Sequence, residues 1–221
     1  MLRSDWEELY SRSDPWGYLG SYHERIRKSI IDEFVKWSRP GRGLDMACGE
    51  GTLTKVLAKY VNSLQAFDIS ERAIAMAKSY NSEPNIQYFQ NDIKDFNADS
   101  SDFDFVLCAE VIYYLNPKEI DKLFFTVDKA LQPWGYFILT TRINSWFSFD
   151  DFTEIIQHHF TVIAIIPVWR PEKLIYKAWK RAMSIFSPLS DRYYKSWLMG
   201  MNPEKAGMCA FICIKKRVTE Q

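Results

Sequence analysis

The sequence predicts an α/β fold in which a doubly wound, mostly parallel seven-stranded sheet carries a helical insertion before its last strand. Between residues 42 and 142, apolar segments of strand length alternate with amphipathic segments of helix length, and the connections are short. This alternation is typical of parallel sheets with right-handed crossover helices. The length of 221 residues suits one domain, since domains usually hold about 50 to 250 residues.

Four apolar runs predict the first four strands, and the fourth run is continuously apolar, as expected for a strand that is buried on both faces. The helix expected after the first strand carries its apolar residues on one stripe. Ser70 is expected to cap the next helix with its side-chain oxygen, and Glu71 follows in the first turn, where negative charge is favoured. The expected strands are residues 42–48, 63–68, 85–92 and 103–111, and the helices between them are 52–61 and 71–80.

A helix is expected after the fourth strand with Pro117 in its first turn, where proline is favoured. The alternation of strands and helices changes after residue 142. Beyond it, a basic and aromatic segment of about residues 170–205 predicts the helical insertion. Cys209 and Cys213 are expected to share one face of the final strand, because side chains alternate along a strand. The remaining expected elements are helices 116–131 and 150–160 and strands 135–142, 161–169 and 207–216.

The composition excludes several classes of protein. The 28 basic residues balance the 28 acidic ones, which argues against nucleic acid as a partner, because phosphate binding usually needs a basic excess. Every apolar run is shorter than the roughly 18 residues that cross a bilayer, so no contact with a membrane is expected. The four cysteines and three histidines lack the spacing of a metal site, and none is predicted. Buried thiols in a reducing cytoplasm are expected instead. The oligomeric state is left open.

Polar residues follow each of the first four strands at its carboxyl end. Asp45 and two glycines, Gly49 and Gly51, belong to the first strand and the turn after it. Glycine lets a backbone approach a ligand closely, and the helix after the turn offers unpaired N–H groups. In a doubly wound sheet, ligands bind beyond these strand ends. The residues at the next three ends are Asp68, then Asn91 and Asp92, then Glu110.

These residues suit an adenine nucleoside. Asp68 can accept both hydroxyl hydrogens of a ribose, as a charge-assisted pair. Asp92 is positioned to accept from an adenine amino group, and Ile93 supplies a neighbouring N–H. Ile69 and Ile93 can hold the ring between them. The sequence therefore predicts a nucleoside site at this edge of the sheet.

The segments LDMACGEG, FDIS, QNDI and FDFVLCAEVIYYL resemble the successive motifs of class I S-adenosylmethionine-dependent methyltransferases, over roughly residues 40–145. A nicotinamide dinucleotide dehydrogenase is the rival, but its fingerprint needs glycine or alanine three residues after the second glycine, where this chain has Thr54. The resemblance implies S-adenosyl-L-methionine as the cofactor. The residues it implies for cofactor binding are Asp45, Ala47, Cys48, Gly49, Gly51, Asp68, Ile69, Asn91, Asp92, Ile93, Ala109, Glu110 and Val111.

A narrower resemblance joins SDPWGYLGSYHERIRK to AEVIYYL. The pair is similar to the nodulation-factor N-methyltransferases, which methylate an amine on a glucosamine oligosaccharide. This resemblance implies an N-terminal helical segment, 1–40, that covers the cofactor site of a methyltransferase domain, 41–221. The segment's candidates for covering the cofactor are Trp16, Tyr18, Tyr22 and Arg25, although aromatic residues in such a helix can equally belong to the core. Arg25 can pair with the methionine carboxylate.

The stretch after the fourth strand bears on the acceptor. Many small-molecule O-methyltransferases carry histidine there, whereas this chain has Tyr113 and Tyr114. Tyr113 is the first candidate for lining the methyl site, Tyr114 the second, and His23 is a candidate base. We therefore expect methyl transfer to a small acceptor such as an amino-sugar or nucleotide-sugar, with nitrogen favoured over oxygen. Transfer to a sugar or metabolite hydroxyl, and cofactor binding without turnover, stay as alternatives.

Overall fold

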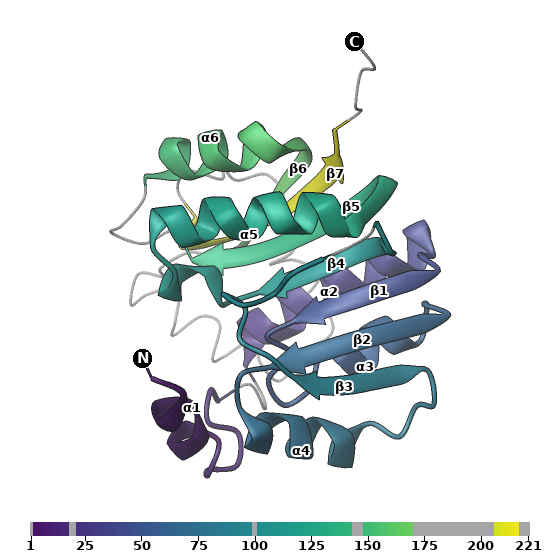
Figure 1. Cartoon of the computed structure of the whole chain (residues 1–221), viewed down its shortest axis with the longest axis vertical. Helices are drawn as coiled ribbons and strands as arrows, with labels where there is room; N and C mark the ends of the chain where they lie inside the picture. The colour runs from purple at the N-terminus through teal and green to yellow at the C-terminus, as the bar shows by residue number, and fades with distance from the viewer. Residues whose placement is uncertain (1, 18–20, 99–100, 143–147, 170–205, 217–221) are drawn as a thin grey trace, which may run out of the picture.

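The computed structural model describes residues 2–17, 21–98, 101–142, 148–169 and 206–216. In this part of the chain, seven strands form one sheet in the order β3-β2-β1-β4-β5-β7-β6 (Figure 1). Neighbours among β1 to β5 pair in parallel, whereas β7 runs antiparallel to both β5 and β6. The predicted α/β fold is confirmed. The strands are β1 Arg42–Met46, β2 Ser63–Asp68, β3 Ile86–Gln90, β4 Phe103–Ala109, β5 Leu131–Arg142, β6 Phe160–Trp169 and β7 Met208–Lys215.

The direction of the strand order reverses between β1 and β4. The chain moves outward from β1 to β2 and β3, and then returns to place β4 on the other side of β1. Ala47 and Glu110 directly follow β1 and β4, and both have positive φ, 54° and 57°. The chain therefore turns sharply at both strand tips. A crevice at such a reversal is the usual ligand site of this architecture.

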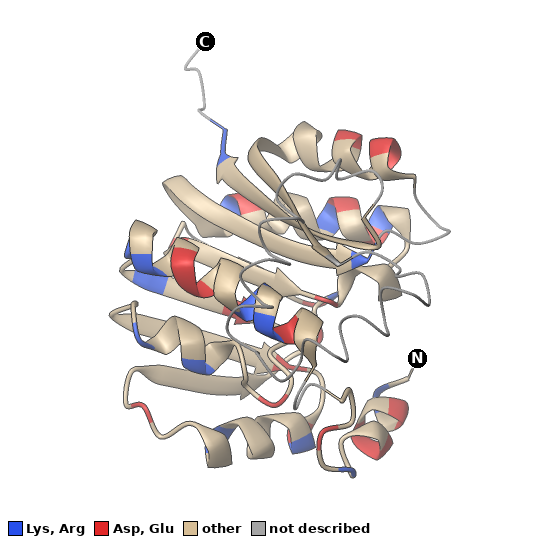
Figure 2. Ribbon diagram, turned by 180° about the vertical axis from the view of Figure 1, so that it is seen from behind, with Lys and Arg blue, Asp and Glu red and all other residues tan. Residues whose placement is uncertain are grey.

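Helices cover both faces of the sheet. Helices α2 and α3 lie on one face, and α5 and α6 lie on the other (Figures 1 and 2). Helix α4 packs beside β2 and β3, and α1 lies next to α4. The helices are α1 Arg3–Leu9, α2 Tyr22–Ser38, α3 Thr54–Ala58, α4 Glu71–Tyr80, α5 Pro117–Ala130 and α6 Phe149–His159, with a 3₁₀ turn η1 at Ile112–Tyr114.

The core divides into two main layers, one on each face of the sheet. The layer beneath α5 and α6 contains fully buried aromatic rings, among them Phe124, Phe137 and Phe160. The layer beneath α2 and α3 is mostly aliphatic and includes Ile31 and Leu57. Cys209 and Cys213 both belong to the aromatic layer, which confirms that they share one face of β7. Apolar side chains therefore fill the space on both faces of the described sheet, while the buried acids Asp45, Asp68 and Glu110 lie at strand ends.

Several local predictions are confirmed, and α3 and β5 depart most from their predicted bounds. The Ser70 hydroxyl accepts from the Ala73 N–H (3.2 Å) and caps α4 as expected, and Pro117 stands in the first turn of α5. Helix α3 is shorter than predicted, because the chain after Gly51 first makes a turn. Strand β5 begins earlier than predicted, because it pairs with Phe103 of β4 ahead of an irregularity in register.

Two predictions concern residues outside the described part of the chain. Tyr18 and the insertion at about 170–205 both fall there, so what was expected of them stays a prediction. Within the described ranges, none of the helices combines the length and the apolar character that crossing a bilayer requires.

Candidate active site

The two glycines of the β1–α3 turn have different tasks. Both have positive φ, 54° at Gly49 and 76° at Gly51, a conformation that favours glycine. Gly49 lines a pocket, and its N–H donates to Asp68 Oδ2 (2.9 Å). Gly51 instead faces α4, where an added Cβ would lie 2.6 Å from Asn81 Nδ2 and 2.9 Å from the Ala77 Cβ. Gly51 therefore lets α4 pack closely and does not line the pocket.

Two buried carboxylates stand at the tips of β1 and β2. Asp45 is 1% exposed and accepts from the Thr54 hydroxyl at 2.6 Å. Burial raises its pKa to about 7, although the bond from Thr54 opposes the shift. Asp68 accepts from the backbone N–H groups of Gly49 and Ser70, both at 2.9 Å. Burial raises the pKa of Asp68 to about 6 against the effect of these bonds. Both acids are thus fixed in place by short local bonds.

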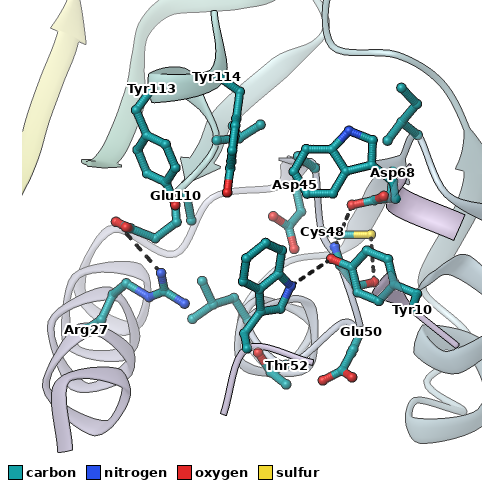
Figure 3. Close-up of a pocket in the computed structure, with 18 residues that line it drawn as sticks. Tyr10, Arg27, Asp45, Cys48, Glu50, Thr52, Asp68, Glu110, Tyr113 and Tyr114 are labelled. Atoms are coloured by element: carbon teal, nitrogen blue, oxygen red, sulfur yellow. Dashed lines mark hydrogen bonds and ion pairs between the residues drawn. The ribbon is translucent and has the colours of Figure 1, made fainter. Parts of the chain in front are cut away.

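Two adjoining pockets open at these strand tips. The first runs from Asp68 and Cys48 at one end to Glu110 and Arg27 at the other (Figure 3). The second holds about 500 Å³ and lies at the tip of β3. Their common wall is Trp6, Ala47, Ile69, Val111 and Tyr114. Of the predicted site residues, the first pocket is lined by Trp16, Asp45, Ala47, Cys48, Gly49, Asp68, Ile69, Ala109, Glu110, Val111, Tyr113 and Tyr114, and the second adds Asn91, Asp92 and Ile93.

The N-terminal segment lies over the first pocket. The Trp6 ring of α1 meets the Tyr114 ring edge-on, with centroids 4.9 Å apart. Trp16 Nε1 donates to the Tyr10 hydroxyl (3.2 Å), and that hydroxyl sits 3.0 Å from where a Cβ on Gly49 would be. Trp6 and Tyr10 were not singled out from the sequence. Their signal was the presence of two large aromatic residues in the acidic run DWEELY.

Glu7 attaches α1 to the first turn of α4. Its carboxylate accepts from the N–H of Glu71 (2.7 Å) and of Arg72 (3.3 Å) and from the Ser70 hydroxyl (3.0 Å). The Arg72 guanidinium donates back to the Glu7 carbonyl oxygen (2.7 Å). Burial alone would raise the pKa of Glu7, but these bonds lower it below its ordinary value. The helix N-terminus, whose N–H groups lack helical partners, therefore holds the covering segment.

Helix α2 turns a different arginine toward the site from the one predicted. Tyr22, His23 and Arg25 line neither pocket, and Arg25 is exposed with its guanidinium 5.2 Å from the Tyr22 ring centroid. Arg27, two positions on and so on the opposite side of the helix, is 2% exposed and lines the first pocket. The roles expected of Tyr22, His23 and Arg25 stay predictions.

Arg27 could have been found from helix periodicity. Glu24 and Arg27 are one turn apart and form an ion pair on the buried side of α2, and Ile31 continues that face toward the core. A charged pair on an otherwise apolar stripe is unusual, because burying charge is costly unless a partner or ligand compensates it.

The chain matches a family model described as a methyltransferase domain over residues 44–135. Nodulation protein S of Azorhizobium caulinodans is 30% identical over 159 residues, which cover 68% of this chain and 76% of that protein. The chain therefore belongs to the class I S-adenosylmethionine-dependent methyltransferases, as the motifs predicted. A Bacillus subtilis protein named as a methyltransferase, YqeM, is 31% identical over 144 residues. The aligned part covers 61% of this chain and only 57% of that longer relative.

Solved structures show the same fold. The N-methyltransferase NodS from Bradyrhizobium japonicum, in complex with S-adenosyl-L-homocysteine, superposes with a TM-score of 0.73 at 18% identity, over 97% of this chain and 98% of that one. The DhpI complex with S-adenosylhomocysteine gives a TM-score of 0.65 at 15% identity, over 95% of each chain. Identities this low establish the architecture and leave the acceptor to be argued from the site.

Proposed function

We propose that this protein transfers a methyl group from S-adenosylmethionine to an amine nitrogen on a small acceptor of the amino-sugar class. The observation that carries the proposal is the pocket at the tips of β1, β2 and β4, where buried carboxylates, a glycine turn and aromatic rings converge. Such a set of groups suits a ligand that combines hydroxyls, a cationic centre and a carboxylate. The four free cysteines also suit a reducing compartment, and we extend the proposal to the cytoplasm on that ground.

The residues at the site fit the cofactor. Asp68 offers a carboxylate for the two ribose hydroxyls, and buried Arg27 offers a guanidinium for the methionine carboxylate. The second pocket, of about 500 Å³, has a volume typical of small-molecule sites, and Asp92 and Ile93 line it toward an adenine ring. When bound, S-adenosylmethionine supplies a methyl group on a positively charged sulfur.

Aromatic residues and the covering segment would prepare the site for transfer. Tyr113, Tyr114 and Trp6 present rings to the first pocket, and ring faces stabilise a nearby cation. Trp6 and Tyr10 narrow the access of water, which strengthens electrostatic interactions inside. Holding the acceptor nitrogen in line, at a distance close to contact, accounts for much of the rate in reactions of this kind.

Nitrogen is favoured over oxygen by the groups present. A hydroxyl acceptor needs a positioned base during transfer, whereas an amine needs only to lose its extra proton beforehand. Among the described residues, neither pocket has a histidine in its lining, and the turn after β4 carries tyrosines instead. The N-methyltransferase activity named for the structural relative agrees with this choice.

Transfer of radiolabelled methyl to defined sugars tests the acceptor. We expect label on the amine of a glucosamine tetrasaccharide and none on its fully N-acetylated counterpart. Label on the hydroxyls of the acetylated sugar would favour O-methylation. Calorimetric binding of S-adenosylmethionine without transfer to either sugar would favour a binding module.

Two substitutions test the assignment of residues. Asp68→Asn keeps the shape of the side chain and removes its charge, so we expect cofactor affinity to fall by about 10- to 100-fold, the effect of losing bonds to a charged group. Unchanged affinity would remove the ribose assignment. Tyr113→Phe should slow turnover more than it weakens cofactor binding, and an equal loss of both would count against a place at the methyl site.

A further inference from the structure

Glu110 is held in a strained conformation at the wall of the first pocket. It directly follows β4 with φ of 57°, a region that non-glycine residues seldom adopt and that concentrates at functional sites. Its N–H donates to the Thr140 carbonyl oxygen of β5 (2.8 Å), which fixes the backbone. The side chain is 5% exposed and lines the pocket. The fold thus holds the buried Glu110 carboxylate at the pocket wall.

The Glu110 oxygens accept no hydrogen bond of regular geometry from the residues that the structure describes. The Thr140 hydroxyl is near enough to act on the carboxylate. Arg27 Nη1 lies 3.8 Å from Oε1, and Arg142 Nε lies 3.7 Å from Oε2. Both separations exceed the roughly 2.7 to 2.9 Å of a charge-assisted hydrogen bond. Buried acceptors are almost always satisfied in native proteins, so these oxygens have capacity for the donors of a ligand.

Of the two arginines near Glu110, one is held in place and the other is free to move away from the carboxylate. Arg27 already pairs with Glu24 on the same helix. Arg142, at the end of β5, is 62% exposed, and its guanidinium lies 5.9 Å from the Tyr113 ring centroid. Burial raises the pKa of Glu110, while Arg27, the Thr140 hydroxyl and Arg142 oppose the shift. An exposed arginine can swing into solvent at little cost, which leaves room for an incoming cation.

We propose that Glu110 binds the amino group of the acceptor. The proposal rests on the N-methyl transfer proposed above. Glu110 lies at the opposite end of the first pocket from Asp68 (Figure 3) and does not line the second pocket. With the nucleoside at the Asp68 end and the methionine carboxylate at Arg27, the cofactor extends toward Glu110. The second substrate must therefore meet the methyl group at the Glu110 end. Tyr113 stands beside Glu110 there and can pack against the acceptor.

The chemistry balances without any further group. An acceptor ammonium donates to the Glu110 carboxylate, which takes one of its protons and leaves a lone pair on nitrogen. The nitrogen–carbon bond then forms as the sulfur–carbon bond breaks, and the electron pair of the broken bond stays on sulfur. Glu110 also selects for amines, because an acetylated nitrogen or a hydroxyl brings no positive charge to the carboxylate.

Glu110→Gln is the direct test, since it keeps the shape of the side chain and removes the charge. We expect the KM for the glucosamine tetrasaccharide to rise about 10- to 100-fold. The Kd of S-adenosylhomocysteine, measured by calorimetry, should change less than about threefold. Glu154→Gln, on the exposed side of α6, is the matched control and should leave both quantities unchanged.

If Glu110→Gln does not fold, a second pair of variants tests the same proposal. Asp and Asn both tolerate positive φ and differ from each other only in charge, so Glu110→Asp should keep a lower KM than Glu110→Asn by about tenfold. Equal KM within this pair would overturn the proposal. So would a loss of S-adenosylhomocysteine affinity as large as the rise in KM, because Glu110 would then serve the cofactor.

The same measurements separate this proposal from the function it rests on. Wild-type transfer to the amine with an unchanged KM in Glu110→Gln overturns the role of Glu110 alone. A wild-type protein that methylates none of the amines offered overturns the proposed N-methylation and the role of Glu110 together.

Discussion

Replacing Asp45 by asparagine should stabilise the protein, and by more at pH 8 than at pH 5. Asp45 is 1% exposed, and its Oδ2 accepts from the Thr54 hydroxyl at 2.6 Å. The amide oxygen of asparagine can accept the same bond with the same shape. The substitution therefore removes the carboxylate's ability to ionise and little else.

The magnitude follows from the pKa of Asp45. Burial raises it from 3.8 to about 7, so the folded state holds this proton more tightly than the unfolded state does. The stability associated with the raised pKa is fully present below about pH 4 and is lost as the pH rises to about 7. Between pH 5 and about pH 7 the protein loses free energy of unfolding over two pH units, or about 3 kcal/mol at roughly 1.4 kcal/mol per unit. Asparagine does not ionise, so the free energy of unfolding of Asp45→Asn relative to the wild type should increase by about 3 kcal/mol between pH 5 and pH 8.

Urea denaturation at the two pH values, followed by circular dichroism, measures the growth of the advantage. Taking the change between pH values cancels any constant difference between amide and carboxyl. Asp150→Asn, exposed in the first turn of α6, is the control and should differ by less than about 1 kcal/mol between the two conditions. An advantage of Asp45→Asn that is the same at pH 5 and pH 8 would refute a raised pKa for this group.

Two further substitutions test the packing around the site. Glu7→Ala should remove about 1 kcal/mol of helix capping, so α1 should become about fivefold more sensitive to limited proteolysis. Glu8→Ala, at an exposed position, should leave the sensitivity unchanged. Equal sensitivity in the two variants would argue against the attachment of α1 to α4. Gly51→Ala should destabilise by about 2 to 4 kcal/mol, through its positive φ and contact with α4, as measured by thermal unfolding. Gly17→Ala has the same sign of φ with no atom within 4 Å of the added Cβ, so it should cost about 1 kcal/mol, and an equal loss in the two variants would show that contact with α4 is unimportant.

Apolar periodicity and capping residues predicted the strands of the sheet and the residues at their carboxyl ends. The bounds of β2 and α4 match the prediction at both ends, because an apolar run, a capping serine and an acidic first turn all indicate the same elements. Asp45, Asp68, Asp92 and Glu110 were found because parallel strands bring their carboxyl ends to one edge. These positions depend only on periodicity and strand order, which the sequence carries directly.

What escaped prediction depends on tertiary contacts. Arg25 and Arg27 are equally basic, and only the rotation of α2 on the sheet decides that Arg27 faces the pocket. Trp6 contacts a ring more than one hundred positions further along the chain, and Glu7 bonds to residues more than sixty positions away. The sequence predicts that Gly51 faces the ligand, but it lines neither pocket, and its close approach to Ala77 is visible only once α4 is in place.

The buried carboxylates make the fold less stable than neutral residues would, and this cost points to a ligand. Burial raises the pKa of Asp45 to about 7 and that of Asp68 to about 6, so ionising either group costs more free energy in the folded protein than in the unfolded chain. A ligand that brings positive charge recovers part of that free energy, and S-adenosylmethionine brings two positive groups. Saturating S-adenosylmethionine should therefore raise the melting temperature of the wild type at pH 8 by more than that of Asp45→Asn. An equal rise in the two proteins would mean that the charge of Asp45 serves no part of binding, and its burial would then need another explanation.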